Sequence, residues 1–212
     1  MKFIIATKLE MSQRFKADGT VVPVTLLKAE PCKVTQIKTK EIDGYESIQV
    51  GCGNEKHPTK PEAGHTKALG QAFKVLGEFC TGAGDLKIGD VVDLSQFAAG
   101  EFVEVEGVSK GKGFQGVVKR HHFRGGPKTH GQKDQLRMPG SIAGGGRNCK
   151  GRVVLGMRMA GRMGGDQVTV KNLEVVEVDA AKNVIALKGA VPGARGAVIM
   201  VSGGAAEKQS WK

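Results

Sequence analysis

Residues 102–116 read FVEVEGVSKGKGFQG and join two kinds of sequence within a few positions. Apolar and acidic residues alternate from Phe102 to Glu106, and this period of two is typical of a strand with one buried face. From Gly107 onward the alternation stops and the chain becomes rich in glycine and lysine. The stretch therefore predicts that a β-strand of a folded body leads directly into a segment of a different kind.

Short alternating runs rich in β-branched residues lie on both sides of that segment. Turn signals such as Asp18-Gly19 and Asp43-Gly44 separate them. The expected strands are 3–6, 21–27, 32–38, 45–50, 88–94 and 102–106 before the segment, and 167–170, 173–179, 184–187 and 197–201 after it. Short strands with frequent turns are typical of a small antiparallel barrel or sandwich, so we predict a mainly β fold.

The strand rhythm is interrupted at about residues 54–84. The polar residues 54–65 are expected to form a surface loop, and residues 66–78 a short helix. The two flanks of the glycine-rich segment look like one β domain that the segment interrupts. The predicted organisation is a body made of residues 1–106 and 165–212, and an extension made of residues 107–164.

The extension differs from the rest of the chain above all in charge. It holds 13 of the 32 Lys/Arg residues and only one of the 21 Asp/Glu residues, Asp134, so the net charge of +11 resides there. A segment that is so basic and so rich in glycine buries little apolar surface. This burial is too small to offset the conformational entropy that the segment would lose on ordering. It needs a partner of opposite charge, and a long polyanion such as nucleic acid is the first candidate.

Other features of the composition indicate a cytoplasmic protein without a membrane partner. The four cysteines have neither a CxxC pair nor zinc-ligand spacing, as expected of reduced thiols in a cytosolic protein. No apolar run approaches the length of a membrane span. Residues 1–8 lack the apolar core of a signal peptide, so we expect the first strand to begin almost at Met1.

Enzymatic motifs are not favoured. Residues 111–116, GKGFQG, match the G-x-G-x-x-G pattern, but the dinucleotide fold also needs a helix after the third glycine and an apolar parallel strand before the first. Here Val117 to Arg120 run into HHFRGGP, and the preceding strand carries glutamates. A nucleotide-dependent enzyme therefore stays only a rival interpretation. We identify no catalytic residues, no cofactor and no small-molecule substrate.

The histidines of the extension suit RNA better than a metal ion. His121 and His122 are adjacent and project differently, and with His130 and Cys149 they form no second close-spaced pair of ligands. Among so many lysines and arginines, imidazoles that stack on bases or donate to phosphates are the favoured interpretation. We therefore predict no metal site.

The remaining side chains of the extension suit phosphate binding without catalysis. Exposed N–H groups in glycine turns form anion-binding concavities, and arginine bridges phosphates or stacks on unpaired bases. The glycines predicted to let the backbone approach RNA are Gly111, Gly113, Gly116, Gly125, Gly126, Gly140, Gly161 and Gly164. The predicted RNA-binding side chains are Lys110, Lys112, Lys119, Arg120, His121, His122, Arg124, Lys128, His130, Lys133, Arg137, Arg147, Lys150, Arg152, Arg158 and Arg162.

Several strings in the right order resemble the ribosomal large-subunit protein L-three family, over essentially the full chain. They are GVSKGKGFQGVVKR at 107–120, PGSI at 139–142, MAGRMG at 159–164, VTVKNL at 168–173 and KGAVPG at 188–193. One departure lies at the tip of the extension. Many bacterial relatives have a glutamine there, whereas this chain has none between Leu136 and Asp166.

The resemblance implies a non-enzymatic, structural rRNA-binding protein of the ribosome. Its β-barrel body would bind the large rRNA near the 3′ end, and its extension would run towards the peptidyl-transferase centre. Members of the family nucleate subunit assembly and touch neighbouring ribosomal proteins. A free-standing RNA-binding or RNA-chaperone protein is the alternative that the charge pattern alone leaves open.

Overall fold

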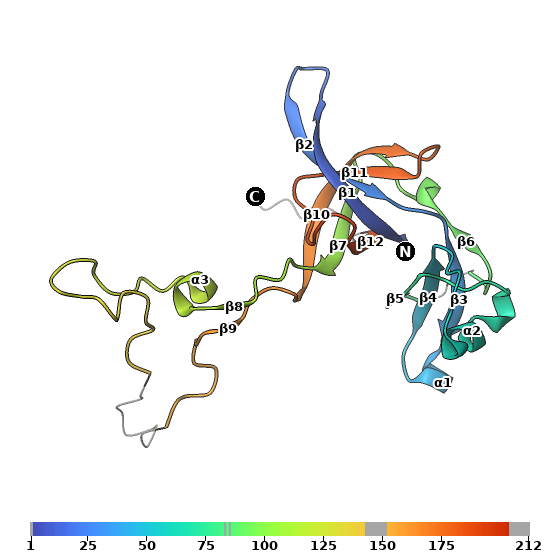
Figure 1. The fold of residues 1–212 in the computed structure, drawn as a ribbon. Coiled ribbons are helices and arrows are strands. Elements are labelled where there is room, and N and C mark those ends of the chain that lie inside the picture. Colours follow the sequence, from blue (N-terminus) through green and yellow to red (C-terminus); the bar gives the residue numbers. More distant parts are fainter. Residues whose placement is uncertain (1, 83, 85, 143–151, 204–212) are drawn as a thin grey trace. The chain divides into compact units, whose positions relative to one another are not determined.

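The structure, a computed structural model, describes residues 2–82, 84, 86–142 and 152–203 (Figure 1). Backbone proximity groups the chain into two compact units. We call Met1–Val108 together with Gln167–Lys212 the body, and Ser109–Asp166 the arm. Among the described residues, no helix has the length and apolar character needed to cross a bilayer.

The body contains a closed antiparallel barrel. Its strands, in order around the barrel, are β1 (Phe3–Phe15), β12 (Val198–Gly203), β7 (Phe102–Val108), β10 (Gln167–Asp179), β11 (Val184–Lys188) and β2 (Val21–Lys28). Strand β1 pairs with β12 on one side and with β2 on the other, so the two ends of the chain complete the barrel together. The prediction of a mainly β fold with an antiparallel barrel is confirmed.

Strands β7 and β10 join the body to the arm. They pair antiparallel from Phe102 opposite Glu174 to Val108 opposite Gln167, so the two points where the chain leaves and re-enters the body face each other. The register shifts between Val170 and Leu173, beside Asn172 at φ 59°. This bulge corrects the prediction of two separate strands, because one strand of 13 residues runs through it.

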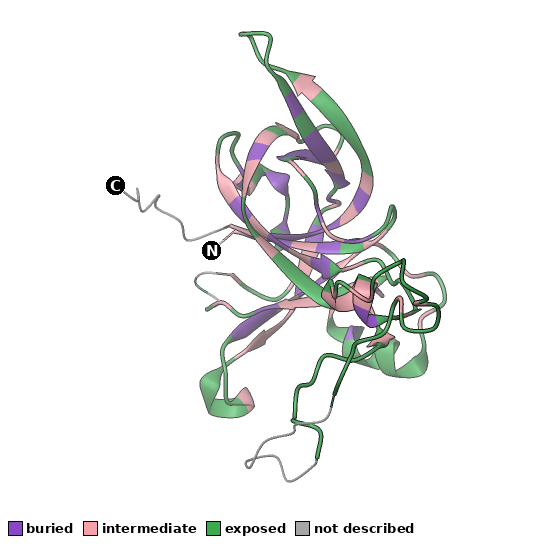
Figure 2. Ribbon diagram, turned by 90° about the vertical axis from the view of Figure 1, so that its left-hand side faces the viewer, coloured by how far each residue is buried: buried purple, intermediate pink, exposed green. Residues whose placement is uncertain are grey.

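A second antiparallel sheet of the body shares the hydrophobic core with the barrel. Its strands, in spatial order, are β5 (Val75–Phe79), β4 (Ser47–Cys52), β3 (Cys32–Lys38) and β6 (Val91–Val92). The rings of Phe3 on β1 and Phe79 on β5 stack with centroids 4.8 Å apart. Figure 2 shows the buried residues concentrated along the strands of the body, which is where the β-branched residues of the sequence lie.

The predictions for residues 54–78 were wrong. Helix α2 (Lys60–His65) lies in the expected loop, and the expected helix is replaced by a 3-10 turn, η1 (Lys67–Leu69), followed by β5. A capping box between Thr59 and Glu62, with a proline in the first turn, starts α2. Gly70 at φ 61° ends η1, and pairing with β4 makes residues 75–79 a strand. Tertiary pairing thus overrides the local helical pattern.

Two smaller differences have local causes. Strand β6 covers only Val91–Val92 of the expected strand 88–94, because Gly89 at φ 96° turns the chain before it. After it, the Asp93 side chain accepts a hydrogen bond from the Ser95 amide and starts a 3-10 turn, η2 (Leu94–Gln96). The short helix α1 (Lys40–Asp43), which the sequence did not predict, ends at Gly44 in the left-handed conformation.

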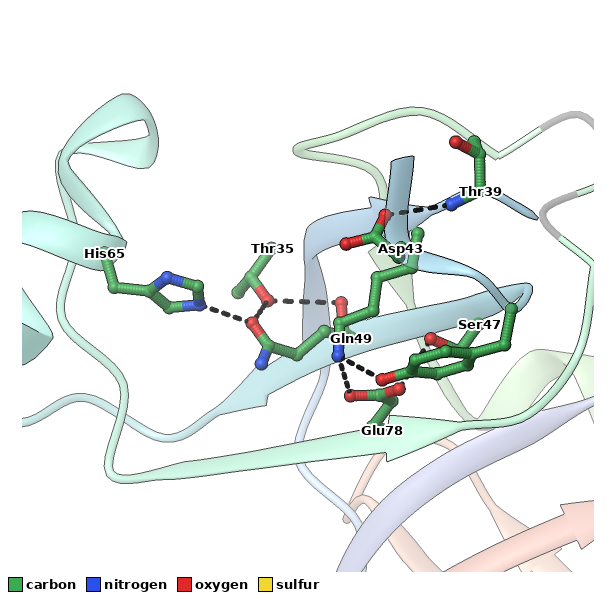
Figure 3. A network of polar contacts seen from close by, with 9 residues as sticks. Thr35, Thr39, Asp43, Ser47, Gln49, His65 and Glu78 are labelled. Atoms are coloured by element: carbon green, nitrogen blue, oxygen red, sulfur yellow. Dashed lines mark hydrogen bonds and ion pairs between the residues drawn. The ribbon is translucent and has the colours of Figure 1, made fainter. Parts of the chain in front are cut away.

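A polar network covers part of the second sheet (Figure 3). The Lys38 ammonium donates to Glu78 Oε2 and to the Tyr45 hydroxyl, each at 2.6 Å, and the Ser47 hydroxyl donates to Glu78 Oε1 at 2.6 Å. The ammonium of Lys38, assisted by Ser47, lowers the pKa of the Glu78 carboxyl to about 2. The same contacts raise the pKa of Lys38.

Side-chain hydrogen bonds connect helix α2 to the second sheet in the same region (Figure 3). His65 Nε2 lies 2.7 Å from Gln49 Oε1, which also accepts a hydrogen bond of 2.8 Å from the Thr35 hydroxyl. Gln49 is on β4 and Thr35 on β3, so one amide connects two strands and the helix. The position of α2 on the body is therefore set by a side-chain network as well as by its connections along the chain.

Gly51 on β4 should be required for stability, because a Cβ added there would overlap the buried Phe73 ring, with Cδ2 at 2.6 Å. We expect Gly51→Ala to lower the free energy of unfolding by about 1–3 kcal/mol, as for overpacked cores. Gly64→Ala on α2 is the matched control, since no heavy atom lies within 4 Å of that position. It should be neutral or stabilise by up to about 1 kcal/mol. Urea unfolding followed by circular dichroism measures both, and equal midpoints would contradict the packing argument.

Glu78 should make stability depend on pH in the acid range. Its pKa is depressed in the folded state, so its contribution is complete above the unfolded value of 4.5 and is lost as the pH falls towards about 2. We expect Glu78→Gln to flatten the fall in the free energy of unfolding over this interval. Glu41→Gln, at an exposed position on α1, is the control and should keep the wild-type slope. Urea titrations at a series of acid pH values provide the test, and parallel curves for wild type and Glu78→Gln would refute it.

Candidate nucleic-acid interface

The arm begins as two hydrogen-bonded chain segments. The Ser109 amide donates to the Asp166 carbonyl at 2.8 Å, and the Lys112 amide donates to the Met163 carbonyl at 2.8 Å. The pairing continues into a short ladder between β8 (Phe114–Gln115) and β9 (Gly161–Arg162). Main-chain bonds between the two segments thus hold this first part together, and the Ser109 side chain adds to them by accepting a hydrogen bond from the Asp166 amide.

The two segments approach each other closely at Gly164. This residue has φ 73°, and an added Cβ would overlap the Lys110 carbonyl oxygen and lie 3.1 Å from Gly111 Cα. Any side chain there would both strain the backbone and push the segments apart. The requirement for glycine at this position therefore comes from the arm itself and needs no partner.

Beyond the ladder, a single helical turn folds back on the returning segment. Helix α3 (Val117–His121) follows Gly116 and ends at His122, which takes the left-handed conformation at φ 60°. Arg120 Nη1 donates to the Met159 carbonyl at 2.9 Å, and His121 Nε2 lies 3.0 Å from the same oxygen. Arg120 and His121 therefore help to hold the arm together, and α3 is far shorter than a dinucleotide-binding helix.

Glycines also shape the loop between Phe123 and Met138. Gly125 has φ 76°, and an added Cβ would overlap the Leu136 carbonyl oxygen, to which the Gly126 amide donates at 3.1 Å. Internal contacts also restrict Gly126 and Gly161, whereas Gly113 and Gly140 are restricted by positive φ alone. At Gly111 and Gly116, by contrast, an added Cβ would meet no heavy atom within 4 Å. Of the eight predicted glycines, only these two are unrestricted by the fold of the arm.

The basic side chains of the arm are not neutralised within the part of the chain that the structure describes. All nine ion pairs found there join residues of the body. The exposed predicted residues are Lys110, Lys112, Lys119, His122, Arg124, Lys128, His130, Lys133, Arg137, Arg152, Arg158 and Arg162. Arg120 and His121 are half-buried, and Arg147 and Lys150, with the tip that lacks glutamine, lie outside the described residues.

Apolar side chains are exposed among these cations. Phe114 is 77% exposed and Leu155 fully exposed, and Met138 and Val154 are also open to solvent. Phe15 and Ile42 of the body are exposed as well, at 68% and 87%, so exposed apolar side chains are not confined to the arm. On the arm, however, they lie among cations that make no ion pair within the described residues. Aromatic and apolar groups beside arginines are the combination that stacks on unpaired bases and contacts ribose.

The geometry of the arm offers no metal centre in the described residues. Within residues 2–142 and 152–203, less the two gaps at 83 and 85, no three His, Cys, Asp or Glu side chains come together as ligands. His122 and His130 are exposed, and the nearest polar partner of His121 is a carbonyl oxygen. The imidazoles of His122 and His130 are therefore open to solvent, whereas His121 is engaged within the arm.

The sequence did not reveal a second basic surface, which lies on the body. Two adjoining hollows share Lys28, Glu30 and Gly53, and Lys33 and Lys74 complete their basic lining. Lys28 pairs with Glu30 at 2.7 Å, and Lys33 donates to Gln71 at 2.9 Å. Lys28 and Lys33 lie five residues apart, but Lys74 is distant from both in the sequence and comes near them through the pairing of the second sheet, so no local motif marks the group.

Comparison with known proteins identifies the family. A family model described as Ribosomal protein L3 matches residues 83–186. Large ribosomal subunit protein uL3 of Herpetosiphon aurantiacus is 51% identical over 202 residues, which cover 94% of each chain. The proteins of the same name from Solibacter usitatus and Dehalococcoides mccartyi (strain ATCC BAA-2266 / KCTC 15142 / 195) are 51% and 47% identical, each over 93% of this chain and 96% of the relative.

This chain belongs to the ribosomal protein L3 family. The resemblance stated from the sequence is thereby confirmed. Members of this family are structural ribosomal proteins, so the chain is a structural protein and not an enzyme. The G-x-G-x-x-G string at 111–116 accordingly belongs to the start of the arm, where it spans the pairing with residues 161–164.

Gly164 and Gly116 should respond differently to alanine. Gly164→Ala strains a left-handed residue against the Lys110 carbonyl and should open the first part of the arm, so that trypsin cleaves at Lys110 and Lys112 several-fold faster. Gly116→Ala is the matched control, because its φ of −72° and its open surroundings accept a methyl group. Time courses of limited proteolysis on the free full chain measure the difference. Identical rates for the two variants would contradict the close approach at Gly164.

Proposed function

We propose that the chain is a structural component of the large ribosomal subunit and binds its large rRNA near the 3′ end. In this proposal the arm enters folded RNA towards the peptidyl-transferase centre, and the protein helps to nucleate subunit assembly beside neighbouring ribosomal proteins. It acts in the cytoplasm as part of the ribosome. The names of the relatives, which are large ribosomal subunit proteins over nearly their full lengths, support the first part.

The observation that carries the proposal is the unpaired charge of the arm. Its described lysines and arginines make no ion pair with another described residue, although nine such pairs join described residues of the body. A surface of this kind repels itself until anions neutralise it, and binding to phosphates releases the counterions that nucleic acid condenses. Folded RNA supplies closely spaced phosphates on several sides of a narrow arm.

The residues of the arm divide into two groups in this proposal. Exposed cations such as Lys112, Arg124 and Arg158 contact phosphates, while Arg120 and His121 position the backbone through the Met159 carbonyl. The exposed apolar side chains contact bases or ribose. The positioning pair acts on RNA binding only through the conformation of the arm.

The body contributes a second phosphate contact. Lys33 and Lys74 line the adjoining hollows, and Lys74 is exposed there. The Gln71 side chain orients the Lys33 ammonium, which fixes one charge at a defined place on the surface. Two separated contacts would bind the same RNA more firmly than either alone, since the second contact forms within one complex.

A free-standing RNA-binding or RNA-chaperone protein is the rival, because the same charge pattern suits it. Sedimentation separates the two. A stoichiometric component stays with large subunits through moderate salt at one copy per particle, whereas a free RNA binder is washed off. Loss of the chain from washed large subunits would overturn the proposal in favour of the rival.

RNA binding should depend steeply on salt and on the cations of the arm. If six to ten phosphates are neutralised, the slope of log K against log salt is about −5 to −9. Replacing Lys112, Arg124 and Lys128 by Gln should make this slope less negative by about two to three, because up to three phosphate contacts are lost. The control replaces Lys40, Lys182 and Lys188 by Gln; each pairs with an acid on the body, so this variant should keep the wild-type slope. Filter binding of the full chain to isolated large rRNA measures both, and a flat response to salt would refute the electrostatic basis.

A further inference from the structure

Two cysteines of the body lie opposite each other in the second sheet. Cys32 begins β3 and Cys52 ends β4, and the antiparallel register pairs them directly. Residues paired in this way point to the same face with Cβ atoms about 4.5–5.5 Å apart, close to the 3.5–4.5 Å of a disulfide. Their sulfur atoms approach the same acceptor, the Glu30 carbonyl oxygen, at 3.5 Å and 3.7 Å. The two thiols therefore share one small space and need only a slight closing movement to bond.

The two thiols differ in their surroundings. Cys32 is completely buried in the core, whereas Cys52 is half-buried and lines a hollow together with Lys28 and Lys74. The contact between the thiols lowers the pKa of Cys52 and raises that of Cys32, which burial raises further. Cys52 is thus the more accessible thiol and the one that ionises more readily, and Cys32 is the protected thiol beside it.

We propose that Cys52 and Cys32 form a peroxide-responsive pair that closes to a reversible disulfide between β4 and β3. The Cys52 thiolate attacks one oxygen of hydrogen peroxide, the O–O bond breaks, and hydroxide leaves, so that Cys52 becomes a sulfenic acid. The Cys32 sulfur then attacks the Cys52 sulfur; the S–S bond forms and the S–OH bond breaks. The hydroxide from the peroxide takes up the proton that Cys52 released on ionising, and the hydroxide from the sulfenic acid takes up the Cys32 thiol proton, so two molecules of water leave in total. A dithiol reductant restores both thiols by exchange.

Other pairings are disfavoured by the same ladder. Cys80 follows Phe79, which pairs with Ile48, whereas Cys52 pairs with Val75 at the other end of the β4–β5 ladder. The four residue steps from Ile48 to Cys52 span about 13 Å at roughly 3.3 Å per step, too far for a bond to Cys80. Cys149 lies outside the described residues. A disulfide from Cys52 to Cys32 links strands that are already paired, so the fold accommodates it without rearrangement.

The experiment uses the full chain with Cys80→Ser and Cys149→Ser, which leaves only the pair. After treatment with equimolar hydrogen peroxide, we expect the intact mass to fall by two hydrogen atoms and both thiols to resist iodoacetamide under denaturing conditions. A dithiol should restore both. Peptide mapping should recover the segments around residues 32 and 52 joined by a disulfide. A chain that keeps two free thiols under these conditions would overturn the proposal, and this readout requires no change at either position.

Single variants in the same background test the order of the steps. Cys32→Ser should stop at a Cys52 sulfenic acid, which dimedone traps, whereas Cys52→Ser should react with peroxide at least several-fold more slowly. Circular dichroism and urea unfolding verify that each variant is folded, and Cys32→Ala replaces Cys32→Ser if the buried hydroxyl destabilises the core. Equal trapping at both positions would refute the assignment of Cys52 as the reactive thiol. The outcome is independent of rRNA binding, because the experiment uses the free chain without RNA.

Discussion

The antiparallel pairing of β7 with β10 is the constraint on which the rest of the structure depends. It completes the barrel and also holds together the two ends of a 58-residue excursion. Val103 and Val105 on β7 are completely buried, so the strand that carries the arm is fixed by the core of the body. The conformational entropy lost when the ends of a loop are brought together rises only with the logarithm of the loop length. A long insertion therefore costs only slightly more of this entropy than a short one. The barrel can therefore support an arm that contributes little to its stability.

The stabilising contacts lie mainly in the body, whereas most of the unpaired charge lies on the arm. On the body, opposite charges pair and one core of buried apolar side chains is shared by the barrel and the second sheet, so the two sheets stabilise each other. On the arm, the described cations are unpaired and large apolar side chains are exposed, so it has little to gain from folding alone. Substitutions of exposed cations should consequently change RNA affinity and leave the unfolding of the body unaltered. Gly164, Arg120 and His121 are the exceptions, because they shape the arm itself.

Much of the body could be predicted, because alternation of apolar and polar residues reports directly which face of a strand is buried. The strands at 21–28, 32–38, 102–108 and 184–188 follow their patterns closely. The pattern failed where a local signal competed with distant contacts: residues 75–79 pair with β4 although their sequence suggested a helix. At α2 the alternation pattern failed although a local signal for a helix is present in the sequence. This signal is the capping box of Thr59 and Glu62, which alternation does not report. For the arm, the sequence predicted which positions carry charge, but not which of these side chains the arm uses for its own structure.

The sequence by itself determined the mainly β character, the segregation of positive charge into one segment and the resemblance to ribosomal protein L3, because each is carried by residue types and their order. Only the tertiary structure decided the relations between distant residues. It closed the barrel with both chain ends, gathered Lys28, Lys33 and Lys74 around adjoining hollows, and set Cys32 opposite Cys52. The physical reason is that strand register is fixed by burial and hydrogen bonding between segments far apart in the chain. No local pattern contains that information.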